Sequence, residues 1–204
     1  MEKRFVKESR YSRWLKPLWP LLLLGLVAAA ASLATGDASP ALRYERSNVL
    51  AGEWWRVITG QLVHLGFSHL VLNLAGLALI AWVFGPGLRA VQWLVILVAS
   101  WIAIITGFVW LEPQLAWYVG LSGLLHGLLL GAAVVDHGLG GRVRMLLLAG
   151  ILLKLAWEQW AGALPMTAEA AGGPVIVDAH LYGGLGGLLG GTLLWLRDRV
   201  RARV

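Results

Sequence analysis

The chain alternates long apolar runs with short polar connections. Each run is rich in Leu, Val, Ile, Ala and Gly and holds almost no charged side chain. A helix of roughly 20 apolar residues crosses the hydrocarbon core of a bilayer, and the shorter runs suit a thinned bilayer or a site open to water. The pattern therefore predicts an all-α, polytopic membrane bundle of six transmembrane helices. The runs fall near residues 17–34, 69–84, 88–109, 122–135, 145–160 and 179–196.

Polar segments divide the chain into a basic N-terminus at 1–16, a membrane domain at 17–196 and a basic tail at 197–204. Within the membrane domain, two connections are long. Residues 36–68 are amphipathic, and residues 161–177 contain two prolines and a glycine pair, which predicts a mobile loop. A long connection inside a compact domain is usually functional.

Composition narrows the class of protein. The chain is 58% hydrophobic and only 14% charged, which is typical of integral membrane proteins. There is no cysteine, which excludes disulfides and thiolate chemistry. The net charge of +6 is not a sign of nucleic-acid binding, because the basic residues lie at chain ends and in short turns. The expected surroundings are a lipid bilayer, with no nucleic-acid partner.

The distribution of basic residues predicts the orientation. Six spans place both chain ends on one side, and that side carries most of the 17 lysines and arginines. The opposite side carries Arg43, Arg46 and Arg56. Basic loops stay in the cytoplasm, so both termini are expected there, in an inner (cytoplasmic) membrane with the long loops facing the periplasm. The first run could alternatively be a cleavable signal peptide, which would not alter the orientation of the other spans.

Two apolar runs carry stripes of glycine on one helix face. The first stripe holds Gly123, Gly127 and Gly131, and the second holds Gly183, Gly187 and Gly191. Small residues at this spacing let two membrane helices approach closely. Ser122, between Gly120 and Gly123, begins the first run, and His180 lies at the start of the second. If the stripes pack together, the hydroxyl meets a base that can take its proton, so we expect a nucleophile and a general base.

A third run adds polar groups at the same depth. His69 and Asn73 are four residues apart and share one helix face. In the six-span arrangement, the spans that contain His69, Ser122 and His180 all start on the outer side. His69, Asn73 and the backbone N–H groups of Leu121 and Ser122 could therefore hold an oxyanion. Alternatively, His69 and Asn73 are an interhelical polar pair that holds the bundle together.

These segments resemble the signatures of the rhomboid intramembrane serine proteases. The matching segments are GLSG at 120–123, AHLYGGLGG at 179–187, Trp55-Arg56, His64 and HLVLN at 69–73. The small size, the six-span core and the form GLSGLLHG at 120–127 are most similar to the rhombosortase branch. The resemblance implies Ser122 as nucleophile, His180 as base and His69 with Asn73 in the oxyanion hole. It also implies a membrane-anchored substrate with a C-terminal glycine-rich motif, one span and a basic tail, cleaved near the outer face by hydrolysis or by transfer to an amine.

Three further residues are open to more than one interpretation. His126 lies one turn after Ser122, where rhomboids carry an aromatic residue that stacks on the catalytic histidine. Its imidazole could stack on His180, bond to it, act as the base or simply pack. Lys154 and Glu158, four residues apart in an apolar run, predict an intrahelical ion pair. They could instead contact substrate, since this span borders the lateral opening in rhomboids.

The expected catalytic pair lacks an acid. Asp178 is two residues from His180 and therefore on a different helix face, so the sequence predicts a Ser–His dyad. Trp55, Arg56 and His64 are expected to shape the first loop, and His137 falls in the polar turn at 136–144. No histidine pair shows the HExxH zinc pattern, so no metal and no cofactor are expected.

Two other functions are compatible with an apolar helical bundle. A catalytically inactive rhomboid-like protein would bind or escort membrane segments and need not keep Ser122 and His180. A transporter would spread its polar groups through the midplane of the membrane.

Overall fold

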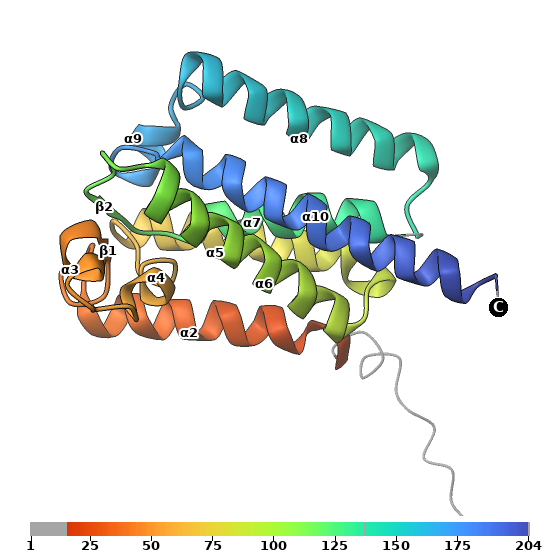
Figure 1. Ribbon diagram of the computed structural model, residues 1–204, viewed down its shortest axis with the longest axis horizontal. Coiled ribbons are helices and arrows are strands. Elements are labelled where there is room, and N and C mark those ends of the chain that lie inside the picture. The colour runs from red at the N-terminus through yellow and green to blue at the C-terminus, as the bar shows by residue number, and fades with distance from the viewer. Residues whose placement is uncertain (1–15, 137, 204) are drawn as a thin grey trace, which may run out of the picture.

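The computed structural model describes residues 16–136 and 138–203, so His137 and the N-terminal segment up to residue 15 lie outside it. Six long helices make up most of the described chain (Figure 1). They are α2 (Trp19–Thr35), α5 (Phe67–Phe84), α6 (Ala90–Thr106), α7 (Ser122–Val135), α8 (Gly141–Ala161) and α10 (Val177–Arg201). Each corresponds to one of the predicted apolar runs, with bounds that differ by a few residues.

Two helices extend beyond the predicted runs. Helix α8 begins at Gly141, inside the predicted turn, and α10 continues to Arg201, inside the predicted tail. Basic side chains near a helix C-terminus interact favourably with the helix dipole, and α10 carries Arg199 and Arg201 in its last turn. The first residues of the predicted polar tail, 197–201, are therefore helical.

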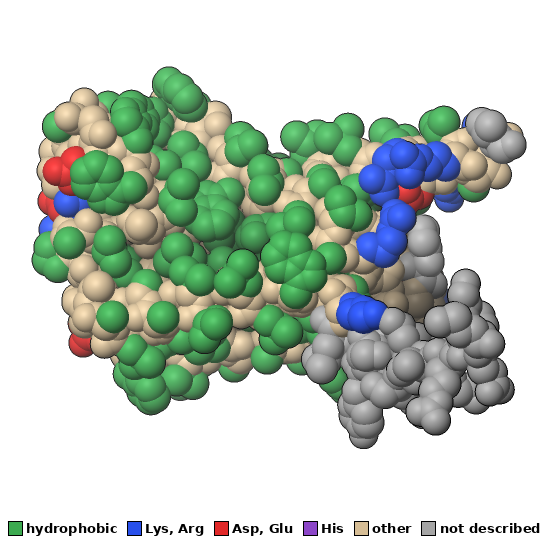
Figure 2. Space-filling model, turned by 90° about the horizontal axis from the view of Figure 1, so that it is seen from below, with side chains coloured by type: hydrophobic (Ala, Val, Ile, Leu, Met, Phe, Trp, Pro, Cys, Tyr) green, Lys and Arg blue, Asp and Glu red, His purple; other side chains and the backbone are tan. Residues whose placement is uncertain are grey.

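Three stretches are long and apolar enough to cross a membrane: Lys16–Thr35, Phe67–Gly87 and Ala90–Leu111. Helix α7 is apolar but has only 14 residues. The protein is an integral membrane protein, and hydrophobic side chains are spread over much of the face seen in Figure 2. Helix α7 is shorter than a full span, and α8 and α10 carry several charged side chains. Six spans therefore remain a prediction.

The connections contain short regular elements. The helical turns η1 (Lys16–Leu18) and η2 (Gly85–Gly87) flank long helices, and a π-helical turn η3 (Gly107–Leu111) extends α6. The connection at 36–68 contains β1 (Tyr44–Glu45), α3 (Arg46–Leu50) and α4 (Arg56–Thr59). The connection at 161–177 is not wholly a loop, because α9 (Thr167–Ala171) forms within it. The elements of the connections at 36–68 and 161–177 gather at the end of the bundle opposite the C-terminus (Figure 1). The turns η1 and η2 contact each other at the other end.

Helix α7 packs against α10 through the glycine stripes, as the sequence predicted. A Cβ atom built on Gly183 would lie 1.9 Å from the carbonyl oxygen of Gly123, and one built on Gly187 would lie 2.0 Å from that of Gly127. A Cβ atom built on Gly191 would lie 2.7 Å from the carbonyl oxygen of Gly131. Backbones this close have no room for side chains, so glycine at these positions sets the distance between the two helices.

The first long connection is held by buried polar contacts. The Arg56 guanidinium donates to the carbonyl oxygens of Pro40 at 2.6 Å and Arg43 at 3.0 Å, and it pairs with the Glu53 carboxylate. His64 is buried and its Nδ1 lies 2.9 Å from the hydroxyl of Ser32 on α2. Burial, and to a lesser extent His69, lower the pKa of His64 to about 3, so this imidazole stays neutral. The structural role predicted for Arg56 and His64 is confirmed.

Candidate active site

A short strand presents the serine. β2 (Trp117–Tyr118) pairs antiparallel with β1, with Tyr118 opposite Tyr44. The Gly120 N–H donates to the carbonyl oxygen of Gly60 at 3.0 Å, and the Tyr118 hydroxyl donates to the carbonyl oxygen of Gly120 at 2.7 Å. Burial raises the pKa of Tyr118 to about 12, so its hydroxyl keeps its proton. The first long connection therefore fixes the backbone just before Ser122.

Gly120 has a conformation and a neighbour that exclude a side chain. Its φ angle is +119°, a region that L-residues rarely adopt. A Cβ atom there would also lie 2.6 Å from Cε1 of His69. Glycine thus lets the imidazole of His69 approach the start of α7.

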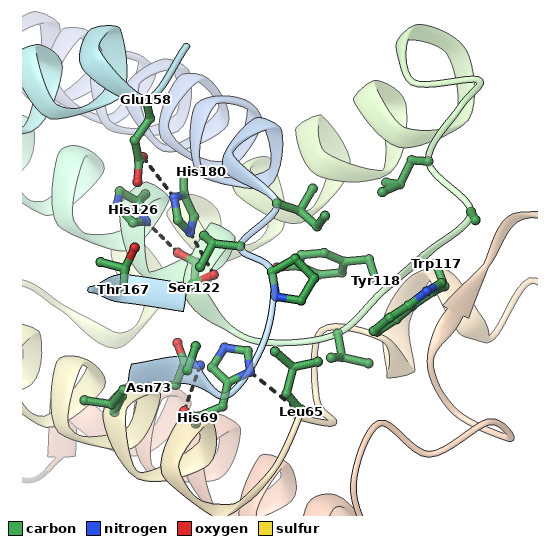
Figure 3. Close-up of a pocket in the computed structure, with 18 of the residues that line it drawn as sticks. Leu65, His69, Asn73, Trp117, Tyr118, Ser122, His126, Glu158, Thr167 and His180 are labelled. Atoms are coloured by element: carbon green, nitrogen blue, oxygen red, sulfur yellow. Dashed lines mark hydrogen bonds and ion pairs between the residues drawn. The ribbon is translucent and has the colours of Figure 1, made fainter. Parts of the chain in front are cut away.

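Ser122 and His180 meet, as the glycine stripes predicted. Ser122 is the first residue of α7, and His180 lies in the first turn of α10. The Ser122 hydroxyl and Nε2 of His180 are 2.9 Å apart (Figure 3). This is the hydrogen bond through which a histidine takes the proton of an attacking serine.

A carboxylate lies behind the histidine. Oε2 of Glu158, on α8, is 2.9 Å from Nδ1 of His180 (Figure 3). Both side chains are buried, with exposed fractions of 2% for Glu158 and 6% for His180. The expectation that no acidic residue is placed beside His180 is therefore wrong. The acid comes from a separate helix, whereas Asp178 on α10 has no bond to this ring.

The predicted ion pair of α8 is confirmed and reaches a second histidine. Nζ of Lys154 is 2.7 Å from Oε2 of Glu158 and 2.7 Å from Nε2 of His126. Nδ1 of His126 is 2.7 Å from the carbonyl oxygen of Ser122. The rings of His126 and His180 stack with centroids 4.1 Å apart and planes 20° apart. Of the roles weighed for His126, the geometry matches stacking.

Both ring nitrogens of His126 have a hydrogen-bond partner, which determines whether this histidine can act as a base. An ammonium group can only donate, so Nε2 of His126 accepts from Lys154 and the ring proton sits on Nδ1. That proton is donated to the Ser122 carbonyl oxygen. No nitrogen of His126 remains to take the Ser122 hydroxyl proton.

His69 and Asn73 face the serine across a cavity of about 430 Å³ (Figure 3). The Leu65 N–H donates to Nδ1 of His69 at 3.3 Å, which leaves the ring proton on Nε2. The Asn73 amide donates one hydrogen to the carbonyl oxygen of His69 at 3.1 Å and keeps another. The N–H groups in the first turn of α7 also have no carbonyl partner within that helix. The cavity therefore has donors on one wall and the nucleophile on the other.

Comparison with known proteins agrees with this geometry. The rhomboid domain family matches residues 51–197. This chain belongs to the rhomboid family. The matched range runs from within the first long connection into α10 and includes Ser122, Glu158 and His180.

One curated rhomboid is similar over part of its length. It is named "Putative rhomboid protease YdcA", from Bacillus subtilis (strain 168), and is 38% identical over 80 residues. The match covers 39% of this chain and 40% of that protein, so this chain spans less than half of its relative's length. The similarity supports the family, while the branch within the family is a prediction from the small size, the six-span core and the GLSGLLHG segment.

Three side chains of this rhomboid have the spacing of a metal site. Ligand atoms of His126, Glu158 and His180 lie within 4.8 Å of one another, which is close enough to share an ion. The ammonium of Lys154 is 2.7 Å from two of these groups and 3.5 Å from Nδ1 of His180. A positive charge thus already stands beside these groups, and the cluster is a hydrogen-bonded network in which each close contact has a donor and an acceptor.

The sequence predicted the histidines of this site, Ser122 and Asn73 but gave no sign of Tyr118. It gave Glu158 as an ion-pair partner of Lys154 or a contact to substrate, and not as a partner of His180. The signal was present: a Lys and a Glu one turn apart in an apolar run mark a polar helix face. Which helix that face meets could not be read from the sequence.

Proposed function

We propose that this rhomboid is an intramembrane serine protease. The observation that carries the proposal is the 2.9 Å contact between the Ser122 hydroxyl and Nε2 of His180, at the edge of a cavity lined by hydrogen-bond donors. The name of the related Bacillus protein points to the same activity.

In the proposed reaction, His180 takes the hydroxyl proton on Nε2 while Ser122 Oγ attacks the scissile carbonyl carbon. The tetrahedral intermediate collapses, the C–N bond breaks, and His180 returns the proton to the departing amine. Water or another amine then attacks the acyl-enzyme, giving its own proton to His180. Collapse of the second intermediate releases the product and regenerates Ser122.

The developing oxyanion needs donors that are already in place. Nε2–H of His69, the second amide hydrogen of Asn73 and the backbone N–H groups of Leu121 and Ser122 are the candidates. The positive end of the α7 helix dipole also stabilises the negative charge of the oxyanion. Loss of one such donor typically costs about 10²–10³ in kcat.

The substrate proposed is a membrane-anchored protein with a single span. By resemblance to rhombosortases, it carries a C-terminal glycine-rich motif, a span and a basic tail, cut near the periplasmic face of the inner membrane. Either water or an amine resolves the acyl-enzyme. Both termini of the enzyme face the cytoplasm in the six-span arrangement proposed here.

An inactive rhomboid-like protein that binds or escorts membrane segments is the alternative. Binding alone needs no hydrogen bond between a serine and a histidine, and no observation favours this function.

A serine-directed probe tests the proposal. A fluorophosphonate should label the detergent-solubilised protein, and Ser122→Ala should abolish labelling. Ser68→Ala, at a second serine near the cavity end of α5, is the matched control and should label like wild type. Labelling that survives unchanged in Ser122→Ala would eliminate Ser122 as the nucleophile.

A further inference from the structure

Five side chains form a closed ring of contacts at the active site. Ser122 contacts His180, His180 contacts Glu158, Glu158 contacts Lys154, and Lys154 contacts His126, whose other nitrogen returns to the backbone of Ser122. The ring joins three helices, α7, α8 and α10. Helix α8 contributes the two charged members.

The donors and acceptors in this ring have one consistent arrangement. An ionised carboxylate only accepts, so Nδ1 of His180 must carry the ring proton that Glu158 receives. Nε2 of His180 is then bare and faces the Ser122 hydroxyl. The carboxylate thus selects the tautomer that a general base requires. The approach of Lys154 to Nδ1 of His180, at 3.5 Å, is longer than the 2.9 Å contact from Glu158.

We propose that Glu158 is a positioning residue for His180, so that the site is a Ser122–His180–Glu158 triad and not a dyad. The inference rests on the proposed protease function. Glu158 holds the imidazole in the orientation and tautomer that accept the Ser122 proton, and it stabilises the imidazolium that forms. The proton stays on His180 until it passes to the leaving amine, and Glu158 remains a carboxylate throughout.

Burial and charge explain why this acid lies beside Lys154. A buried carboxylate is costly unless it is paired and hydrogen-bonded. Glu158 has both partners, the ammonium of Lys154 at 2.7 Å and the imidazole at 2.9 Å. The side chain of Lys154 is 28% exposed. Its ammonium group therefore lies at the edge of the cavity, where it balances the charge of the buried Glu158 carboxylate.

A kinetic experiment separates a triad from a dyad. The charged or titratable groups that line the cavity with His180 are Glu158 and Lys154 from α8, His126 from α7, His69 from α5 and Tyr118 from β2. Asp178, on α10 itself, acts on His180 through its charge alone. Cleavage of a single-span substrate with a glycine pair before its span would be measured against pH for wild type, Glu158→Gln, Glu158→Asp and Asp178→Asn. Membrane levels of each protein would be matched.

We expect Glu158→Gln to lower kcat by about 10²-fold or more, with little change in KM, because the base loses its tautomer and its counter-charge. The acidic limb of its residual pH profile should move to lower pH, since the imidazolium is no longer stabilised. Glu158→Asp should recover part of the rate. Asp178→Asn is the matched control, because it removes a carboxylate two residues from His180 that does not bond the ring, and it should stay within a few-fold of wild type.

A second measurement needs no turnover. In a Ser122→Ala background, the ring proton on Nδ1 of His180 should give a downfield ¹H NMR signal because it is shared with a carboxylate. The signal should disappear in Ser122→Ala/Glu158→Gln and remain in Ser122→Ala/Asp178→Asn. Thermal unfolding in detergent would show whether each variant is folded.

The proposal is overturned if folded Glu158→Gln cleaves at the wild-type rate with an unshifted pH profile, or if the downfield signal persists without Glu158. Either result leaves Ser122 and His180 as a dyad and the protease function intact. Failure of the protease function itself is a different result, namely probe labelling that does not depend on Ser122.

Discussion

At the scale of single residues, two histidines flank Ser122 and their hydrogen bonds give them different chemistry. His180 offers a bare nitrogen to the hydroxyl, because its other nitrogen donates to Glu158. His126 has no free nitrogen, because Lys154 and the Ser122 carbonyl engage both. The rings of His126 and His180 also stack face to face. One ring is thus placed to take a proton, and the other supports the position of the first.

Substitution of each histidine should separate these roles. His180→Ala should lose the general-base contribution, roughly 10²–10⁴-fold or more in cleavage rate. His126→Phe and His126→Tyr should retain readily measured cleavage, because an aromatic ring can still stack on His180, and His126→Ala should fall between. The measurement is cleavage of a single-span substrate with a glycine pair, at matched membrane levels. If His126→Tyr is as inactive as Ser122→Ala while His180→Ala still cuts, the base lies on α7.

At the scale of elements, the α7–α10 contact is what brings the nucleophile to its base. Its glycines leave the two backbones in direct contact, so a methyl group at Gly187 would lie 2.0 Å from the carbonyl oxygen of Gly127. This contact lies two turns from His180 along α10. Any separation of the helices here changes the distance between Ser122 and His180.

Gly187→Ala should therefore reduce both stability and activity. Forcing an extra methyl into a tight interface costs roughly 1–3 kcal/mol, and the catalytic hydrogen bond lengthens with the helix separation. Thermal unfolding in detergent and cleavage rate are the two measurements. Gly150→Ala on α8 is the matched control, because a Cβ atom there meets nothing within 4 Å. The control should be neutral or stabilised by about 0.5–1 kcal/mol, since alanine favours a helix over glycine. Equal behaviour of the two variants would contradict the role of the glycine stripe.

At the scale of the whole molecule, charge is distributed unevenly along the bundle. Lysine and arginine side chains gather toward the end that carries the C-terminus (Figure 2). Arg89, at the start of α6, pairs there with Asp198 near the end of α10, 3.5 Å apart. Ser122 and His180 start their helices at the other end (Figure 1). Under the positive-inside rule, the basic end is cytoplasmic and the site faces the outer side.

Tags should report this orientation. A tag at either terminus should be accessible only from the cytoplasm, and a tag inserted between residues 161 and 177 should be accessible from outside. The measurement is alkaline phosphatase and fluorescent-protein fusion activity at the three positions. A terminus found outside would overturn the orientation, and with it the proposed cleavage near the periplasmic face.

The sequence alone determined the helices and the first two members of the site. Apolar runs locate the helices because a bilayer requires continuous apolar side chains with internally satisfied backbone groups. The glycine stripes paired α7 with α10 because only small residues allow such close backbones. Ser122 and His180 follow from that pairing, since each stands at the start of its stripe.

Tertiary structure alone decided where α8 directs Glu158. In a membrane, lipid and protein interior are both apolar, so the hydrophobic pattern of a helix does not distinguish its buried face from its exposed one. The sequence could therefore pair Lys154 with Glu158 along one helix, but it could not show that this face meets His180 and His126. Only the packing of α8 against α7 and α10 brings the carboxylate to Nδ1 of His180.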